Sequence, residues 1–293
     1  MRASKCAKLT DSADLRRYKV VIPGLKILIA AIAGLAAMVG TWEPVQAEPL
    51  AVGAPPSLRP AFNDILPLFE REYAVAVNVV YTPSKTLLQQ IEKGAPIDVF
   101  LAAGVAEVEY LYKKGLTLNG RPRIYAQTSL VLVMSSNSPA LFVSFHDALS
   151  NQSTRIALGD PQTSSLGGVT ARVLTKFYPT YKSRPHILYG AHSEDIMNLI
   201  RMGKADVGLV FRVDSISNGH IRISDENPIG AYVPIPFGQA VVWTCRDSLR
   251  SAAEQFSDFL MTPRIQKLLV LHGFDSIPLP VGLMPIEKKE RIS

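Results

Sequence analysis

The chain has 293 residues, long enough for two lobes of ordinary size, and 47% of them are hydrophobic. This composition allows a sizeable core and excludes extensive disorder. The formal net charge is +6, but residues 1–47 carry seven Lys and Arg against three acidic residues, so the rest of the chain has 24 basic and 22 acidic side chains. That near balance does not indicate nucleic-acid binding.

The first 47 residues have the pattern of a secretory signal. A basic region ends at Lys26, and the sixteen residues 27–42 are uncharged and mostly apolar. Val45 and Ala47 are small enough for the positions that a signal peptidase reads, so we predict cleavage after Ala47 and a periplasmic mature protein. The alternative is an uncleaved membrane anchor, but the apolar stretch is short for a span of roughly 20 residues.

The sequence after the signal begins with a strand, a turn and a helix. Residues 50–52 are apolar and predict a short strand, and residues 53–56 form a Gly- and Pro-containing turn. The spacing of apolar residues over 58–73 predicts a helix. Ser57 therefore lies between the turn and the start of this helix.

A second unit of the same kind follows. Residues 77–81 and 97–102 are β-branched or apolar and predict two buried strands. Between them, Ser84 is expected to cap a helix over 85–93. A serine hydroxyl and free backbone N–H groups at the positive end of a helix favour binding of a small anion. The alternative for a single serine is an ordinary helix cap, but here the arrangement occurs twice.

The later part of the chain continues the alternation of strands and helices. A strand over 156–158 leads into polar residues 163–168, which we expect to form a flexible loop before a helix over 169–177. This loop is not a P-loop, because no Gly-Lys-Ser/Thr follows it. Ser193 and the two acids after it are expected to begin a helix over 196–202. The other predicted helices cover 105–114, 145–149, 251–261 and 263–272, and the other predicted strands cover 129–135, 207–211, 232–236 and 240–244.

Common catalytic and metal-binding motifs are absent from the sequence. It contains no G-x-S-x-G, no H-E-x-x-H and no paired C-x-x-C, and its five histidines lack metal-ligand spacing. Cys6 would leave with the signal, and Cys245, in an apolar run, is expected to be a buried structural thiol. Several anion cradles without a nucleophile favour binding without turnover, with no cofactor and no metal ligand set.

The fold class that follows is α/β, because strands alternate with helices almost throughout. The serine-containing units and the later polar loop come from both halves of the chain. We therefore expect two α/β lobes that hold a ligand between them and close like a hinge.

Several segments resemble the periplasmic molybdate-binding proteins of ABC importers, which have the type II periplasmic binding protein fold. The segment TLLQQIEKGAPIDVFLAA (86–103), with the preceding serine, is similar to the most recognisable part of that family. Four shorter motifs are similar to family motifs in the same order: GDP at 159–161, SEDI at 193–196, GLVF at 208–211 and HGF at 272–274. The resemblance covers nearly all of residues 50–276.

The resemblance implies which residues hold the ligand. Two serine hydroxyls fall on Ser57 and Ser84, and two backbone N–H donors fall on Leu166 and Ile196. A tyrosine hydroxyl is common at one further position, and here that position is Phe211, which cannot donate a hydrogen bond. Three accessory residues are also expected near the site. These are Arg59, Lys85 and Ser165.

The resemblance also implies the boundaries of the lobes, because the chain crosses between them near residues 128 and 242. With a signal peptide over 1–47, the first lobe would comprise 48–127 and 243–293, and the second lobe 128–242. Each lobe would be a mixed sheet flanked by helices, with the ligand cleft between them.

The function implied is capture of a tetrahedral oxyanion, molybdate or tungstate, and its delivery to the ABC permease in the cytoplasmic membrane. Molybdenum would be present only as bound molybdate, and the protein would be a monomer and not an enzyme. Two alternatives stay open. The ligand could be another small anion, such as sulfate, phosphate or a carboxylate, or the chain could be a ligand-sensing module for a signalling partner.

Overall fold

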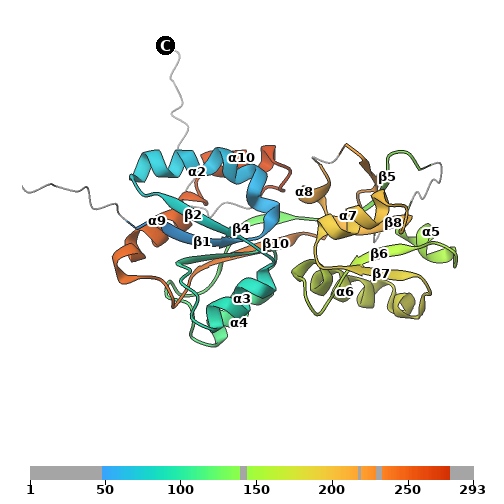
Figure 1. The fold of residues 1–293 in the computed structure, drawn as a ribbon, viewed down its shortest axis with the longest axis horizontal. Helices are drawn as coiled ribbons and strands as arrows, with labels where there is room; N and C mark the ends of the chain where they lie inside the picture. The colour runs from blue at the N-terminus through green and yellow to red at the C-terminus, as the bar shows by residue number, and fades with distance from the viewer. Residues whose placement is uncertain (1–47, 139–143, 217–218, 229–232, 278–293) are drawn as a thin grey trace, which may run out of the picture. The chain divides into compact units, whose positions relative to one another are not determined.

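The structure is a computed structural model that describes residues 48–138, 144–216, 219–228 and 233–277 (Figure 1). The predicted signal peptide and its cleavage site lie outside these residues. In the described ranges, the strands form two five-stranded sheets, each with parallel and antiparallel pairs and with helices against it. This arrangement confirms the predicted α/β class.

The first sheet has the strand order β2-β1-β3-β10-β4. Its strands β1, β2 and β3 run parallel, and β10 pairs antiparallel with β3 and β4. The C-terminal ends of parallel strands meet at one edge of a sheet, so the segments that follow β1 and β2, with Ser57 and Ser84, start from the same edge. The strand bounds are β1 (Leu50–Ala54), β2 (Val77–Tyr81), β3 (Val99–Ala102), β4 (Arg123–Thr128) and β10 (Ile235–Val241).

Helices cover both faces of the first sheet (Figure 1). On one face, the rings of Phe62 and Phe69 in α2 pack edge-on against Phe256 in α9, with centroid distances of 6.2 and 5.0 Å. On the other face, Leu87 and Val108 belong to a separate cluster with residues of β3 and β10. The helices are α2 (Arg59–Tyr73), α9 (Arg250–Phe259) and α10 (Pro263–Leu271) on the first face, and α3 (Ser84–Glu92) and α4 (Ala106–Lys113) on the second.

The second sheet has the strand order β7-β6-β8-β5-β9. The strands β6, β7 and β8 run parallel, and β5 pairs antiparallel with β8 and β9. The strand bounds are β5 (Leu130–Ser135), β6 (Ile156–Gly159), β7 (Ile187–Gly190), β8 (Val207–Phe211) and β9 (Ile221–Asp225). The helices of this part are α5 (Phe145–Ser150), α6 (Ser165–Phe177), α7 (Ser193–Arg201) and α8 (Arg212–Ser215).

The chain passes from the first sheet to the second between β4 and β5, at Ser129. It returns earlier than the expected residue 242, because β10 already belongs to the first sheet from Ile235 onward. The two strands predicted over 232–236 and 240–244 are in fact this one strand, Ile235–Val241. Its register shifts between Phe237 and Gly238, so the glycine marks an irregularity within a strand and not a turn.

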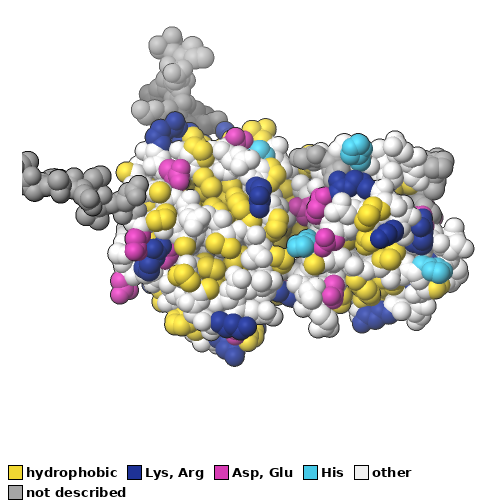
Figure 2. All heavy atoms as spheres, viewed as in Figure 1, with side chains coloured by type: hydrophobic (Ala, Val, Ile, Leu, Met, Phe, Trp, Pro, Cys, Tyr) yellow, Lys and Arg dark blue, Asp and Glu magenta, His cyan; other side chains and the backbone are white. Residues whose placement is uncertain are grey.

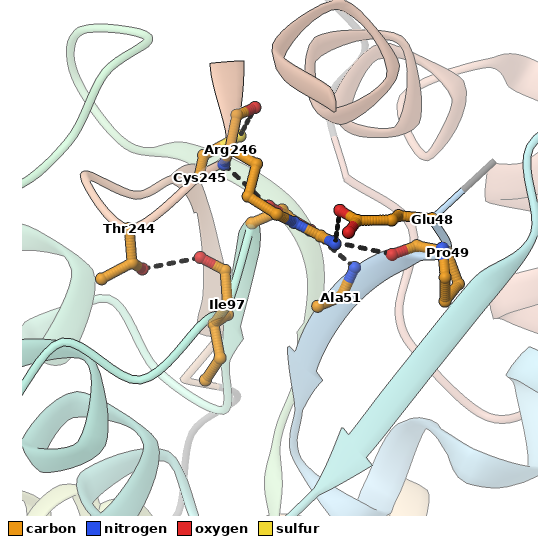
Figure 3. A network of polar contacts seen from close by, with 8 residues as sticks. Glu48, Pro49, Ala51, Ile97, Thr244, Cys245 and Arg246 are labelled. Atoms are coloured by element: carbon orange, nitrogen blue, oxygen red, sulfur yellow. Dashed lines mark hydrogen bonds and ion pairs between the residues drawn. The ribbon is translucent and has the colours of Figure 1, made fainter. Parts of the chain in front are cut away.

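A buried ion pair joins the chain after β10 to the beginnings of β1 and β3 (Figure 3). Asp98 is completely buried and accepts hydrogen bonds from the Ala51 N–H at 2.7 Å and the Arg246 N–H at 3.0 Å. The Arg246 guanidinium donates to Asp98 at 2.6 Å and also to Glu48 and to the Pro49 carbonyl, both at 2.7 Å. The network therefore ties three segments together that are far apart in the sequence.

The predicted structural thiol Cys245 is buried beside this network. Burial, with the nearby Asp98 carboxylate, raises the pKa of Cys245 to about 12. Because the thiolate is the reactive form, we expect Cys245 to resist Ellman's reagent at about pH 8 in the folded protein. The measurement uses a Cys6→Ser variant, so that Cys245 is the remaining thiol. Labelling of the folded protein as fast as that of the protein unfolded in guanidinium would contradict this prediction.

No helix among the described residues has both the length and the apolar character needed to cross a membrane. On the face shown in Figure 2, basic and acidic side chains are interspersed, and the described residues contain no group of three His, Cys, Asp or Glu side chains placed to hold a metal ion.

Candidate ligand-binding site

A cavity of about 520 Å³ is lined by segments that follow strands of both sheets. From the first sheet come the segment after β1, the start of α3 and Ala103. From the second sheet come the starts of α6, α7 and α8, with the end of β8. Six of the eight residues that the sequence pointed to line this cavity. The lining includes Ser57, Arg59, Ser84, Ser165, Leu166 and Phe211.

Ser84 is placed in the cavity wall by the start of α3, but it does not cap this helix. The helix begins at Ser84 itself, and Pro83 occupies the N-cap position without a side-chain bond. The predicted cap is therefore wrong. Instead, the buried Ser84 hydroxyl accepts a hydrogen bond from the Ala103 N–H at 2.9 Å. A serine hydroxyl has one proton to donate, and this contact leaves that proton for another acceptor.

Ser57 lies in a short 3-10 turn, Pro56–Leu58, between β1 and α2. It lines the cavity together with Asp214, which follows β8 in the second sheet, and its hydroxyl acts to lower the pKa of the Asp214 carboxylate. The Ser193 hydroxyl, at the start of α7, donates to the same carboxylate. Two hydroxyls from different parts of the chain therefore converge on Asp214.

Burial raises the pKa of Asp214 above its ordinary value, although hydrogen bonds from Ser193 and Ser57 act in the opposite direction. The nearby Glu194 carboxylate raises this pKa further, and His192 lowers it. Sequence reasoning missed both Asp214 and Ser193. Asp214 follows the GLVF motif by only three residues, but a carboxylate is not a residue type that predicts an anion site.

The start of α6 forms another part of the cavity wall. Residues 165–168, expected as part of a flexible loop, are the first turn of this helix, because Ser164 is its N-cap and accepts from the Gly167 N–H at 2.9 Å. The Gly168 N–H donates to the Ser164 carbonyl at 3.0 Å. The N–H groups of Ser165 and Leu166 belong to the part of a helix that its own carbonyls cannot satisfy.

Two of the three accessory residues make contacts between segments of the two sheets. The Ser165 hydroxyl donates to Glu107, on α4, at 2.7 Å in a buried position. The Lys85 ammonium donates to the Pro161 carbonyl, after β6, at 2.6 Å, and Lys85 does not line the cavity. Arg59 does line it, but its guanidinium lies 4.5 Å from the centroid of the Tyr81 ring in its own lobe.

The start of α7 also forms part of the cavity wall, but Ile196 does not line the cavity. Ile196 is completely buried outside the lining, and its N–H donates to the His192 carbonyl at 3.3 Å. Residues 193–195, directly before Ile196, line the cavity instead. The carboxylate of Asp195 fixes this turn by accepting the N–H groups of Ala191 at 3.0 Å and His192 at 3.2 Å.

Phe211 ends β8 and forms an apolar part of the cavity wall. Its ring packs edge-on against Phe237 of β10, with the centroids 5.4 Å apart. It offers no hydrogen-bond donor at the position where the resemblance would place a tyrosine hydroxyl.

Comparison with known proteins places the chain in a family. A family model described as "Bacterial extracellular solute-binding protein" matches residues 50–275. The chain belongs to the bacterial extracellular solute-binding proteins. This solute-binding protein is 30% identical over 234 residues to the molybdate-binding protein ModA of Mycobacterium tuberculosis H37Rv, covering 78% of this chain and 85% of the relative.

Solved structures share the fold of this solute-binding protein. The periplasmic molybdate-binding protein of Azotobacter vinelandii superposes with a TM-score of 0.65 at 22% identity, covering 78% of this chain and 99% of that chain. The sulfate-binding protein SubI of M. tuberculosis H37Rv gives a TM-score of 0.68 at 17% identity, covering 79% of this chain and 88% of that chain. These similarities establish the two-sheet architecture, which the resemblance implied.

Proposed function

We propose that this solute-binding protein captures a tetrahedral oxyanion, molybdate or tungstate first, and passes it to the permease of an ABC importer. The observation that carries the proposal is the cavity wall at Ser84, Ser165 and Leu166, where a hydroxyl and a helix start meet. Hydroxyl and backbone N–H donors bind an anion without a counterion, and charged acceptors make such bonds stronger.

The names of the relatives support the choice of ligand, because the ModA protein of M. tuberculosis and the A. vinelandii protein are both called molybdate-binding. Sulfate is the second candidate, since the sulfate-binding SubI shares the fold and Phe211 leaves the cavity without a tyrosine donor. We also propose that the chain is exported to the periplasm and cleaved after Ala47, which its signal-like first 47 residues and the periplasmic protein of A. vinelandii support. The exported protein is proposed to act as a monomer.

A screen of oxyanions tests the function directly. Thermal unfolding of the protein with molybdate, tungstate, sulfate and phosphate should show an increase in Tm for the ligand that binds, because a ligand specific for the folded state stabilises it by mass action. Calorimetric titration then gives the affinity. If none of these anions raises Tm or releases heat, the proposed function is wrong.

Ser84→Ala is expected to weaken oxyanion binding on the order of 10- to 100-fold, because a hydrogen bond to a charged group is worth roughly 1.5–3 kcal/mol. The measurement is calorimetry on the folded variant. Ser144→Ala is the matched control, since Ser144 also accepts a backbone N–H, from Asp147 at 3.1 Å, but caps α5 outside the cavity lining. Equal affinities for the two variants would remove Ser84 from the site.

A further inference from the structure

Asp214 is a carboxylate in the wall of the proposed anion-binding cavity. It lines this cavity together with Ser84 and Ser193, and it accepts a hydrogen bond from the Ser193 hydroxyl. Like charges repel strongly where water is excluded. An ionised Asp214 therefore opposes a bound dianion.

Ser84 and Ser193, which both line the cavity, differ in whether their hydroxyl proton is available to a ligand. The Ser84 oxygen accepts the Ala103 N–H, so its single proton is free for a ligand. The Ser193 proton is donated to Asp214, and a hydroxyl cannot donate the same proton to two acceptors at full strength. Asp214 and a bound anion consequently compete for the Ser193 proton. Protonation of Asp214 ends this competition, because a neutral carboxyl group needs no second proton and has one to donate.

We propose that Asp214 determines the pH dependence and the charge preference of ligand binding, so that an oxyanion binds with one proton between itself and this side chain. The carboxylate takes that proton from solvent when the ligand is a bare dianion such as molybdate or sulfate. A hydrogen-bearing oxyanion, such as hydrogenphosphate, brings the proton with it. This inference rests on the proposed function, since it concerns the same cavity.

The charged groups of α7 that face Asp214 have partners of their own. Glu194 pairs with Arg201, and the His192 ring lies 2.6 Å from the Asp195 carboxylate. The pKa of Asp214 is raised, first by burial and then by Glu194, against the effects of its two hydroxyl donors and His192. The direction agrees with a carboxylate that takes up a proton readily.

Neither nearby arginine forms an ion pair with Asp214 in the described residues. Arg59, which lines the cavity from the first lobe, lies over the Tyr81 ring. Arg212, two residues before Asp214, lies 3.7 Å from the Glu226 carboxylate and donates to a backbone carbonyl at 3.3 Å. A proton is therefore the positive charge best placed to neutralise Asp214.

The test is calorimetry of the wild-type protein with sulfate, molybdate and phosphate between about pH 6 and pH 9, in buffers of different ionisation enthalpy. We expect uptake of about one proton when sulfate or molybdate binds above the pKa of Asp214, with affinity falling up to about tenfold per pH unit. Hydrogenphosphate should bind with much less uptake. In Asp214→Asn, the uptake and the pH dependence for sulfate and molybdate should both disappear.

Glu194→Gln is the matched control, because it removes one negative charge from the same cavity wall and leaves the Ser193–Asp214 hydrogen bond in place. It should keep the uptake of about one proton on binding, with the pH profile shifted to lower pH because Glu194 no longer raises the pKa of Asp214. Binding of sulfate or molybdate without proton uptake would overturn this inference and leave the proposed function intact. Absence of binding by every oxyanion would overturn both. The proton uptake of the wild-type protein tests this inference even if Asp214→Asn does not fold.

Discussion

Replacing Arg246 with methionine is expected to lower the free energy of unfolding by about 3–5 kcal/mol at neutral pH, the usual cost of removing one partner of a buried ion pair. Asp98 is completely buried, and the substitution leaves its charge with backbone donors alone. The same substitution frees Glu48 and the Pro49 carbonyl at the beginning of β1. Urea unfolding of the two proteins measures the difference.

The loss should depend on pH in a defined direction. Burial acts to raise the pKa of Asp98, but the hydrogen bonds from Arg246 and from the Ala51 N–H outweigh it, so the pKa lies below its ordinary value. A lowered carboxyl pKa stabilises the folded state above the ordinary pKa of the group, and this stability is lost as pH falls through the folded pKa. The difference between wild type and Arg246→Met should therefore shrink below about pH 4.

Arg123→Met is the control for this experiment, because the same substitution there removes an exposed pair with Asp258. Exposed pairs contribute about 0–1 kcal/mol. If the two substitutions destabilise the protein equally, the buried pair at Asp98 does not hold the segments together as described.

Gly167→Ala is expected to reduce oxyanion affinity on the order of 100-fold or more and to lower the free energy of unfolding by about 1–3 kcal/mol. A Cβ atom at residue 167 would lie 2.2 Å from the carbonyl carbon and oxygen of Asp160. Those atoms belong to the backbone, so no rotamer change relieves the contact. The start of α6 must move away from the end of β6, and the donors at Ser165 and Leu166 move with it.

The next residue of the same helix gives a matched control. A Cβ atom at Gly168 would lie 3.9 Å from the Lys85 ammonium nitrogen, which is an ordinary contact. Alanine also favours a helix over glycine by roughly 0.5–1 kcal/mol. Gly168→Ala should therefore retain its affinity and unfold no more easily than wild type. Calorimetry and urea unfolding of both variants check this pair, and similar results for the two would contradict the packing argument.

Local patterns in the sequence predicted the elements that lie nearest the site. The strand–turn–helix units around Ser57 and Ser84 depend on apolar spacing, Gly and Pro, which act over a few residues. The same patterns failed where tertiary contacts decide the outcome. Ser84 appeared to be a helix cap, but its oxygen is bound to the N–H of Ala103, which is nineteen positions away. Nothing local to Ser84 indicates that partner.

The second half of the site could not be predicted for a similar reason. The strands β4, β7 and β9 were not predicted. The strand β7 has only four residues, and most residues of β9 are half-buried, so the apolar pattern of both strands is weak. Ser57, Ser193 and Asp214 line the same cavity because of the way the two sheets are joined. The periodicity of apolar residues in the sequence does not indicate how sheets are joined. Ile196 was named through the resemblance alone, whereas the structure brings residues 193–195 to the cavity.

The contacts from Ser165 to Glu107 and from Lys85 to the Pro161 carbonyl consist of protein groups alone, so they do not require an anion. Any protein that binds its ligand in one of two arrangements has an apparent affinity reduced by the fraction of molecules outside the competent arrangement. Contacts that join the two lobes increase the competent fraction in advance. Less of the ligand's preference for the joined arrangement is then needed to bring the lobes together, and more of it appears as a higher apparent affinity. The same contacts reduce the structural difference between the ligand-bound and the empty protein. A permease partner that distinguishes the two forms would have to detect this smaller difference.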